Sequence, residues 1–123
     1  MFNPTIKQFR AYCPNIQKML TTGFSIIGET TISGVLDKMN FESGLSLVIT
    51  QFTGAYDKNG KQIYEGDILA FKTPKNETKY YLVQFDSDLF GWGTFENGQR
   101  VWVRMGWCKV VGNYFENKDL LEL

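Results

Sequence analysis

The sequence predicts a mainly β protein, with a β-rich N-terminal subdomain of α+β character followed by a small β-barrel in the C-terminal half. Aromatic residues make up 15% of the chain and favour strands, while 12 glycines divide it into short segments. Many of these segments alternate apolar and polar residues with the period of two that a half-buried strand requires. The length of 123 residues fits one domain, or one domain with a small satellite.

We expect an N-terminal β-rich segment, residues 1–50, which is also a candidate oligomerisation region, ahead of the barrel at residues 51–123. A turn at Cys13-Pro14-Asn15 separates two alternating stretches and predicts a hairpin. Residues 21–44 are interrupted by glycines and give one weak strand signal. The predicted strands of this part are residues 8–12, 17–20 and 32–36.

Residues 45–52 give the clearest strand pattern, with Leu45, Leu47 and Ile49 on one face. The chain then runs into Asp57-Lys58-Asn59-Gly60, where Asn-Gly favours a tight hairpin turn. Asp57 and Asn59 also resemble the start of a calcium loop. The glycine comes two positions too early for that loop and its second half lacks ligands, so a turn is predicted.

From residue 63 onward the pattern predicts a closed or nearly closed barrel of short strands. Gly66 permits a sharp bend, and the Asp67 carboxylate can accept hydrogen bonds from turn amides. A polar loop covers residues 72–78, and Asn97-Gly98 predicts a second tight turn. The chain is expected to end in a helical turn at residues 117–121, with Asn117 as its N-cap. The predicted strands are residues 68–71 after the Gly66-Asp67 bend, and then 79–85, 90–95, 101–105 and 108–113.

Several blocks of sequence resemble the YopX family, whose members are encoded by phages and prophages, chiefly of Gram-positive bacteria. The blocks are Gln51–Gly54, Asp57–Lys61 and Ile63–Ile68, supported by Phe9–Tyr12 and Val110–Asn117. With Leu120-Leu121, the resemblance runs from residue 9 to residue 121. It implies a β-rich fold with a Src-homology-3-like barrel in the C-terminal half, and it assigns no activity to any residue.

The amino-acid composition limits the functions that the chain can have. The chain has 13 basic and 13 acidic residues, so its formal net charge is zero. Nucleic-acid binders normally depend on clustered Lys and Arg. The richest stretch, Lys58–Lys79, has five lysines against three acidic residues, which is typical of solvated hairpin edges. The chain has no histidine, which excludes Ser-His-Asp and Cys-His nucleophiles and histidine-ligated metals.

The two cysteines, Cys13 and Cys108, lack neighbours at metal-ligand spacing, so no zinc site is predicted. We expect both to be reduced and structural, although their spacing does not exclude a disulfide. No apolar run approaches the roughly 20 residues of a membrane span, and the first residues lack a signal core. We therefore expect a cytoplasmic protein of the host cell, without membrane contact, cofactor or metal.

Two kinds of candidate site stand out. Glu65 with Asp67, and Asp86 with Asp88, are carboxylate pairs at a spacing that could share a proton or hold Mg²⁺, but turn and loop roles explain them better. If Val101, Val103 and Met105 face inward, the period of two along a strand turns Trp102 and Arg104 outward together. Exposed Trp–Arg pairs suit interfaces and base stacking, although core packing explains Trp in small barrels more often. The candidate binding surface consists of Tyr80, Trp92, Arg100, Trp102 and Arg104.

Three functions compete at this point. The first is a non-catalytic binding or assembly module that contacts itself, as a homo-oligomer, and an unknown phage or host protein. The second is a nucleic-acid-binding accessory protein, because small barrels often bind oligonucleotides. The third, an enzyme that uses the acidic pairs, is disfavoured because no catalytic motif converges. The aromatic and basic set for nucleic acid would be Tyr80, Tyr81, Trp92, Trp102, Arg100 and Arg104.

Overall fold

The computed structural model describes residues 9–14, 17–20, 25–27, 31–33 and 48–122, and its architecture is mainly β, as predicted. The chain divides into two compact units, Phe9–Thr50 and the region from Gln51 onward. Strand β5 (Val48–Tyr56) begins in the first unit and ends in the second. Each unit is described by itself below.

The described residues of the first unit form two antiparallel hairpins. The predicted N-terminal hairpin is confirmed: β1 (Phe9–Cys13) pairs with β2 (Lys18–Leu20) in the register Tyr12 to Met19. Ala11 and Cys13 are completely buried. A second hairpin joins β3 (Ser25–Ile27), which the sequence did not reveal, to β4 (Thr31–Ser33). The predicted strand at 32–36 overlaps β4, and its remainder lies outside the described residues, as do positions 45–47.

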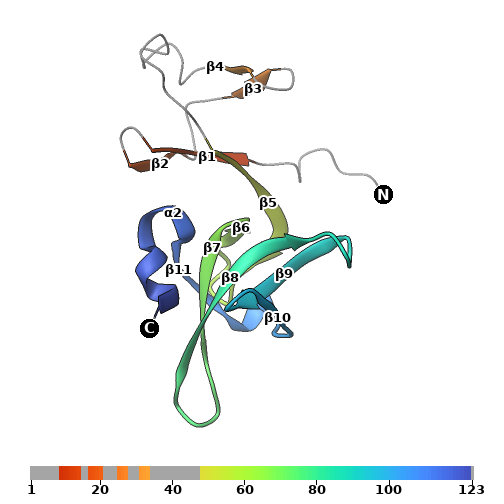
Figure 1. Ribbon diagram of the computed structural model, residues 1–123, viewed down its shortest axis with the longest axis vertical. Helices are drawn as coiled ribbons and strands as arrows, with labels where there is room; N and C mark the ends of the chain where they lie inside the picture. The colour runs from red at the N-terminus through yellow and green to blue at the C-terminus, as the bar shows by residue number, and fades with distance from the viewer. Residues whose placement is uncertain (1–8, 15–16, 21–24, 28–30, 34–47, 123) are drawn as a thin grey trace. The chain divides into compact units, whose positions relative to one another are not determined.

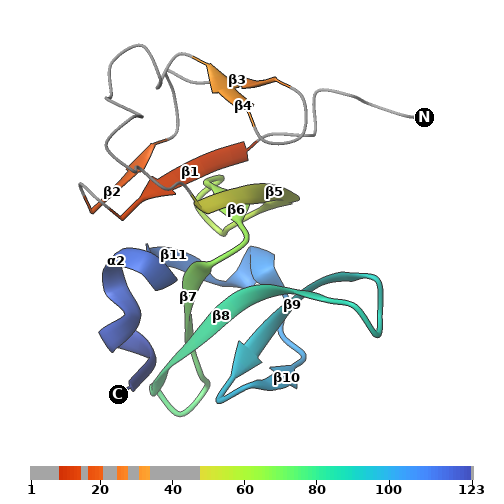
Figure 2. The same ribbon diagram turned by 45° about the horizontal axis from the view of Figure 1, so that its top comes forward.

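The second unit is built on a five-stranded antiparallel sheet in the order β10-β9-β8-β7-β11. Its long central strand, β8, curves between β7 and β9 in both views (Figure 1; Figure 2). β11 pairs with β7 and forms one edge of the sheet, while β10 forms the opposite edge. The strands are β7 (Asp67–Lys72), β8 (Thr78–Asp86), β9 (Gly91–Glu96), β10 (Gln99–Val101) and β11 (Lys109–Asn113).

The sheet forms a half-barrel around a small apolar core. Leu69, Val83 and Val110 come from β7, β8 and β11 of the sheet, and Ile63 comes from β6 (Gln62–Tyr64), which pairs with β5. Three of these four side chains have no exposed surface, and Val110 is 8% exposed. Phe71, Val103 and Met105 pack against the same cluster, so the core continues toward the segment that follows β10.

The turns follow the sequence chemistry. Asn97 and Gly98 have φ of 52° and 79°, the left-handed pair that a two-residue hairpin loop needs. Gly66 has φ of 88° in the turn before β7, where Asp67 Oδ2 accepts the N–H of Tyr64 at 2.8 Å. The predicted turn role of Asp67 is therefore confirmed. No helix among the described segments has the length and apolar character needed to cross a membrane.

Two predictions need correction. The strand expected at 101–105 stops at Val101, and the chain then turns through a 3-10 helix, η3 (Met105–Trp107). The helix at the C-terminus begins earlier than expected, as α2 (Tyr114–Asn117) followed by η4 (Lys118–Glu122). Its N-cap is Asn113 rather than Asn117, because the Asn113 side chain accepts the N–H groups of Phe115 and Glu116.

Candidate functional site

The segment after β10 presents two tryptophans to solvent. Val103 and Met105 pack against the core, while the side chains of Trp102 and Arg104 lie outside the half-barrel. Trp102 is 76% exposed and Arg104 is also exposed, so the predicted outward pair is found although the backbone is not a strand there. Trp107, at the end of η3, is 59% exposed. Sequence reasoning missed Trp107, because its position depends on the 3-10 turn at Gly106 that replaces the expected strand.

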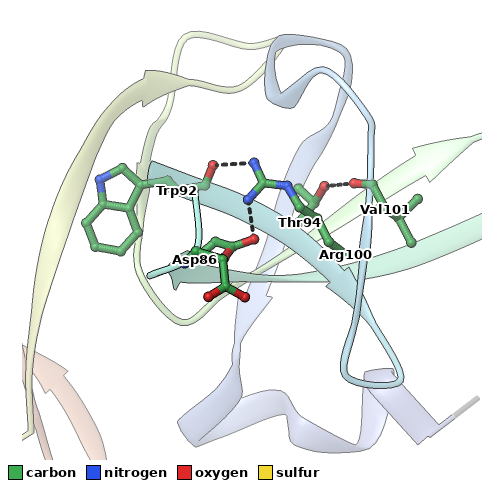
Figure 3. A network of polar contacts seen from close by, with 6 residues as sticks. Asp86, Trp92, Thr94, Arg100 and Val101 are labelled. Carbon is green, nitrogen blue, oxygen red and sulfur yellow. Dashed lines mark hydrogen bonds and ion pairs between the residues drawn. The ribbon is translucent and has the colours of Figure 1, made fainter. Parts of the chain in front are cut away.

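Arg100 fixes the first of these tryptophans. Its Nη1 donates to Asp86 Oδ2 at 2.7 Å and its Nη2 donates to the carbonyl of Trp92 at 3.3 Å (Figure 3). Its Cζ lies 4.2 Å from the centroid of the Trp102 ring, a cation–π geometry. A guanidinium held at two hydrogen bonds gives the ring a preformed position, which reduces the entropy lost on binding.

Glycine makes this arrangement sterically feasible. A Cβ on Gly93 would come within 2.8 Å of Cζ and Nη1 of Arg100, so only glycine leaves room for the guanidinium above β9. The β9–β10 hairpin is further stabilised by the Thr94 hydroxyl, which donates a hydrogen bond to the carbonyl of Val101 (Figure 3). The strand pairing and the glycine together position Arg100.

The ion pair between Arg100 and Asp86 neutralises the charge of Arg100. The hydrogen bond from Arg100 holds the pKa of Asp86 below its ordinary value of 3.8. The two side chains are 18% and 14% exposed, so the pair is largely withdrawn from solvent. Asp86 therefore serves as an ion-pair partner rather than as half of a reactive carboxylate pair with Asp88.

Arg104 differs from Arg100 because no carboxylate within the described part of the chain neutralises it. Its Cζ lies 5.1 Å from the Trp107 ring centroid, and its carbonyl accepts the N–H of Trp107 at 3.0 Å. The surface therefore carries one compensated and one uncompensated guanidinium, each beside an indole. We call this set the aromatic–arginine surface: Trp92, Arg100, Trp102, Arg104 and Trp107.

Two hollows meet at residues 102–104. One, of about 380 Å³, is lined by Phe71 and Tyr81 from the sheet and by both exposed indoles. The other, of about 430 Å³, lies against Trp92, Arg100 and the start of η3. Both hollows are open, mainly apolar and bordered by Arg104. Such a combination suits a side chain or short segment of a partner that is apolar and acidic.

The remaining predicted residues lie apart from this surface or are less accessible. Trp92 is half-buried, with its ring 5.4 Å from that of Phe85 in an edge-on contact. Tyr80 lines a different hollow of about 290 Å³, next to Glu96 and Leu121. Tyr81 is 6% exposed, and its burial raises the pKa of its phenol. The structure thus unites four of the five predicted surface residues and places Tyr80 elsewhere.

The carboxylates and thiols have structural surroundings. The Asp57 carboxylate accepts three backbone N–H groups, from Asn59, Lys61 and Val110, which confirms the turn interpretation of this segment. Cys13 and Cys108 are buried, free thiols. Burial raises the pKa of Cys108 to about 11, so its thiol is a poor nucleophile near neutral pH.

The comparisons with known proteins agree with the sequence resemblance. A crystal structure of protein EF1440 from Enterococcus faecalis is similar, with a TM-score of 0.64 over 94% of this chain and 98% of that one. The identity is 22%, so this likeness concerns the fold alone. No curated protein sequence matches the chain. The profile of the YopX protein family matches residues 8–122, and the chain therefore belongs to the YopX family.

Proposed function

We propose that this YopX-family chain, of phage or prophage origin, is a non-catalytic binding and assembly module that contacts another protein through its aromatic–arginine surface. The observation that supports the proposal most directly is the 76% exposure of Trp102, a ring held from behind by Arg100. Trp and Arg dominate the binding energy of protein interfaces. An exposed indole with a fixed orientation has no role in the core of its own chain.

The non-catalytic character is supported by the use of the acidic side chains. Asp57 and Asp67 accept backbone N–H groups, and Asp86 holds Arg100. Each of these carboxylates is therefore committed to the fold. Glu65 and Asp88 remain from the two predicted pairs. Burial raises the pKa of the Glu65 carboxyl, but its partner Asp67 is 1% exposed. Asp88 is exposed, and its partner Asp86 is held by Arg100.

The strand order supports the finer assignment of a Src-homology-3-like barrel. Four strands form a meander from β7 to β10, a 3-10 turn follows, and β11 returns to pair with β7. In this arrangement the aromatic–arginine surface lies at the segment that would close the barrel. Binding there uses side chains on a rigid support rather than a mobile loop.

Nucleic acid is the second candidate, and the geometry gives it less support. Of the six residues proposed for it, Tyr81 is buried, Tyr80 lines another hollow and Arg100 is paired with Asp86. Trp92, Trp102 and Arg104 remain, and because Trp92 is half-buried they offer one exposed ring and one available charge. A single-strand groove normally needs several of each.

The proposal can be tested by photo-crosslinking in the bacterium that carries the gene. A benzophenone amino acid is placed at position 102, and the matched control places it at position 114. Tyr114 is also exposed, at 39%, and also has a cation near its ring, Lys118 at 5.7 Å. We expect protein adducts from position 102 that disappear with Arg104→Ala, and none from position 114. Equal labelling at both positions, or none at 102, would contradict the proposal.

A further inference from the structure

The turn between β8 and β9 carries a second exposed apolar group. In this tip, residues 87–90, Leu89 is 53% exposed and Phe90 is 86% exposed. Phe90 also has φ of 50°, a left-handed conformation that is unusual for a bulky residue. Packing among the residues that the structure describes explains neither the exposure nor the backbone strain, so the ring is presented outward at an energetic cost.

Hydrogen bonds hold the tip in a defined conformation. The N–H of Asp88 donates to Asp86 Oδ1 at 3.0 Å, and the N–H of Leu89 donates to the carbonyl of Asp86 at 3.2 Å. Asp86 is also the partner of Arg100. One carboxylate therefore fixes both the tip and the arginine that supports Trp102.

The tip and the aromatic–arginine surface are complementary in charge. Asp88 is exposed and has no cationic partner within the described residues, whereas Arg104 has no anionic one. The tip offers one aromatic ring and one leucine side chain beside a negative charge. The hollow between Trp102 and Trp107 offers apolar walls beside a positive charge.

Contacts also lead from β8, the strand that ends at the tip, to the aromatic–arginine surface. The Phe85 ring contacts Trp92 at 5.4 Å, the Trp92 carbonyl accepts from Arg100, and the Arg100 guanidinium lies 4.2 Å from the Trp102 ring. A two-fold dimer interface uses the same patch on both copies, and so requires complementary features on a single patch.

We infer that the occupant of the hollow is a second copy of this chain. Phe90 and Leu89 of one copy enter the Trp102–Trp107 hollow of the other, Asp88 pairs with Arg104, and the contact is repeated across a two-fold axis. This inference rests on the proposed function and names its partner. Covering Phe90, Trp102 and Trp107 on both copies would bury on the order of 1,000 Å², about the minimum for a specific interface.

A charge swap tests the inference. Size-exclusion chromatography with light scattering, over a range of micromolar concentrations, measures the dimer dissociation constant of wild type and variants. We expect Asp88→Lys and Arg104→Glu each to weaken the dimer at least roughly tenfold, and the double variant to recover most of that loss. Phe90→Asn should weaken it similarly, because Asn tolerates the left-handed backbone while removing the ring. Tyr114→Ala is the matched control and should leave the constant unchanged, and circular dichroism confirms the fold of each variant.

The outcomes separate this inference from the proposed function. A monomeric wild-type protein overturns the inference, as does a double variant no tighter than the single ones or a dimer insensitive to Phe90→Asn. If the wild type is monomeric and position 102 still crosslinks to a different protein, the proposed function survives and the inference fails. If neither dimer nor adduct forms, both fail.

Discussion

At the scale of single residues, Asp57 shows how one carboxylate can join distant parts of the chain. Its Oδ1 accepts the N–H groups of Asn59 and Lys61, each at 2.8 Å, and its Oδ2 accepts the N–H of Val110 at 3.0 Å. Burial alone would raise the pKa of Asp57, but these hydrogen bonds and the nearby charge of Lys61 lower it. The β5–β6 turn is thereby fastened to β11.

We predict that Asp57→Asn destabilises the fold by about 2 kcal/mol, because the new amide group would face the Val110 N–H with a donor. The folded pKa lies below the unfolded value of 3.8, so the contribution of Asp57 is complete above that pH and is lost as pH falls through the folded value. Urea unfolding between neutral and acidic pH should show a shallower acid loss in the variant than in wild type. Equal acid dependence would contradict the assignment.

Gly93 gives the second prediction at this scale. Gly93→Ala should displace the Arg100 guanidinium, which lies at the flexible end of its side chain, so the fold survives while the ion pair with Asp86 weakens. The pKa of Asp86 should then rise toward its ordinary value, as carboxyl NMR titration can measure. Gly106→Ala is the control, because the nearest atom to its Cβ, the Tyr56 carbonyl oxygen, is 4.0 Å away. An unchanged Asp86 titration in Gly93→Ala would contradict this role of the glycine.

At the scale of elements, the C-terminal helix depends on a reciprocal pair of asparagines. The Asn113 side chain caps α2, and Asn117 Oδ1 accepts the Asn113 N–H at 3.1 Å. A Cβ at Gly112 would come within 2.5 Å of Asn117 Oδ1, so the end of β11 is also matched to the helix. The two elements are therefore specified together.

Asn113→Ala should cost about 1 kcal/mol of stability, because two N–H groups at the start of α2 lose their acceptor. Asn113→Ser keeps an acceptor oxygen and should retain most of the stability. Thermal unfolding of the three proteins provides the comparison. If Ala and Ser proved equally destabilising, the cap would not be the cause.

The elements that could be predicted from sequence are those with local signals. The Asn97-Gly98 and Asp57–Gly60 turns, the Gly66-Asp67 entry to β7 and the alternation around Tyr81 and Val83 all depend on residues close in sequence. The end of β10 at Val101 could not be predicted, because the 3-10 turn is set by Val103 and Met105 packing on the core. The same tertiary packing determines the position of Trp107, which explains why the aromatic–arginine surface was only partly foreseen.

At the scale of the whole molecule, the balanced charge shapes the choice of partner. The formal net charge is zero, and the uncompensated guanidinium of Arg104 stands beside a mainly apolar hollow. Such a surface favours a partner that buries rings over one that offers only phosphates.

We therefore predict no binding of single-stranded DNA, duplex DNA or RNA at micromolar protein. Fluorescence anisotropy with labelled oligonucleotides at low salt is the measurement, since low salt favours any electrostatic binding. Saturable, salt-sensitive binding that Arg104→Ala abolishes would contradict the prediction and favour the nucleic-acid alternative.

The edges of the five-stranded sheet have a consequence for how this unit can associate. On one side β10 has three residues before the chain leaves the sheet, and on the other β11 contains a register shift between Val110 and Gly112 and lies beside α2 (Figure 1). Short, irregular or covered edges offer poor templates for adding strands from other chains. We therefore expect neither edge of this sheet to recruit a strand from another chain, so that association through this unit depends on side-chain contacts.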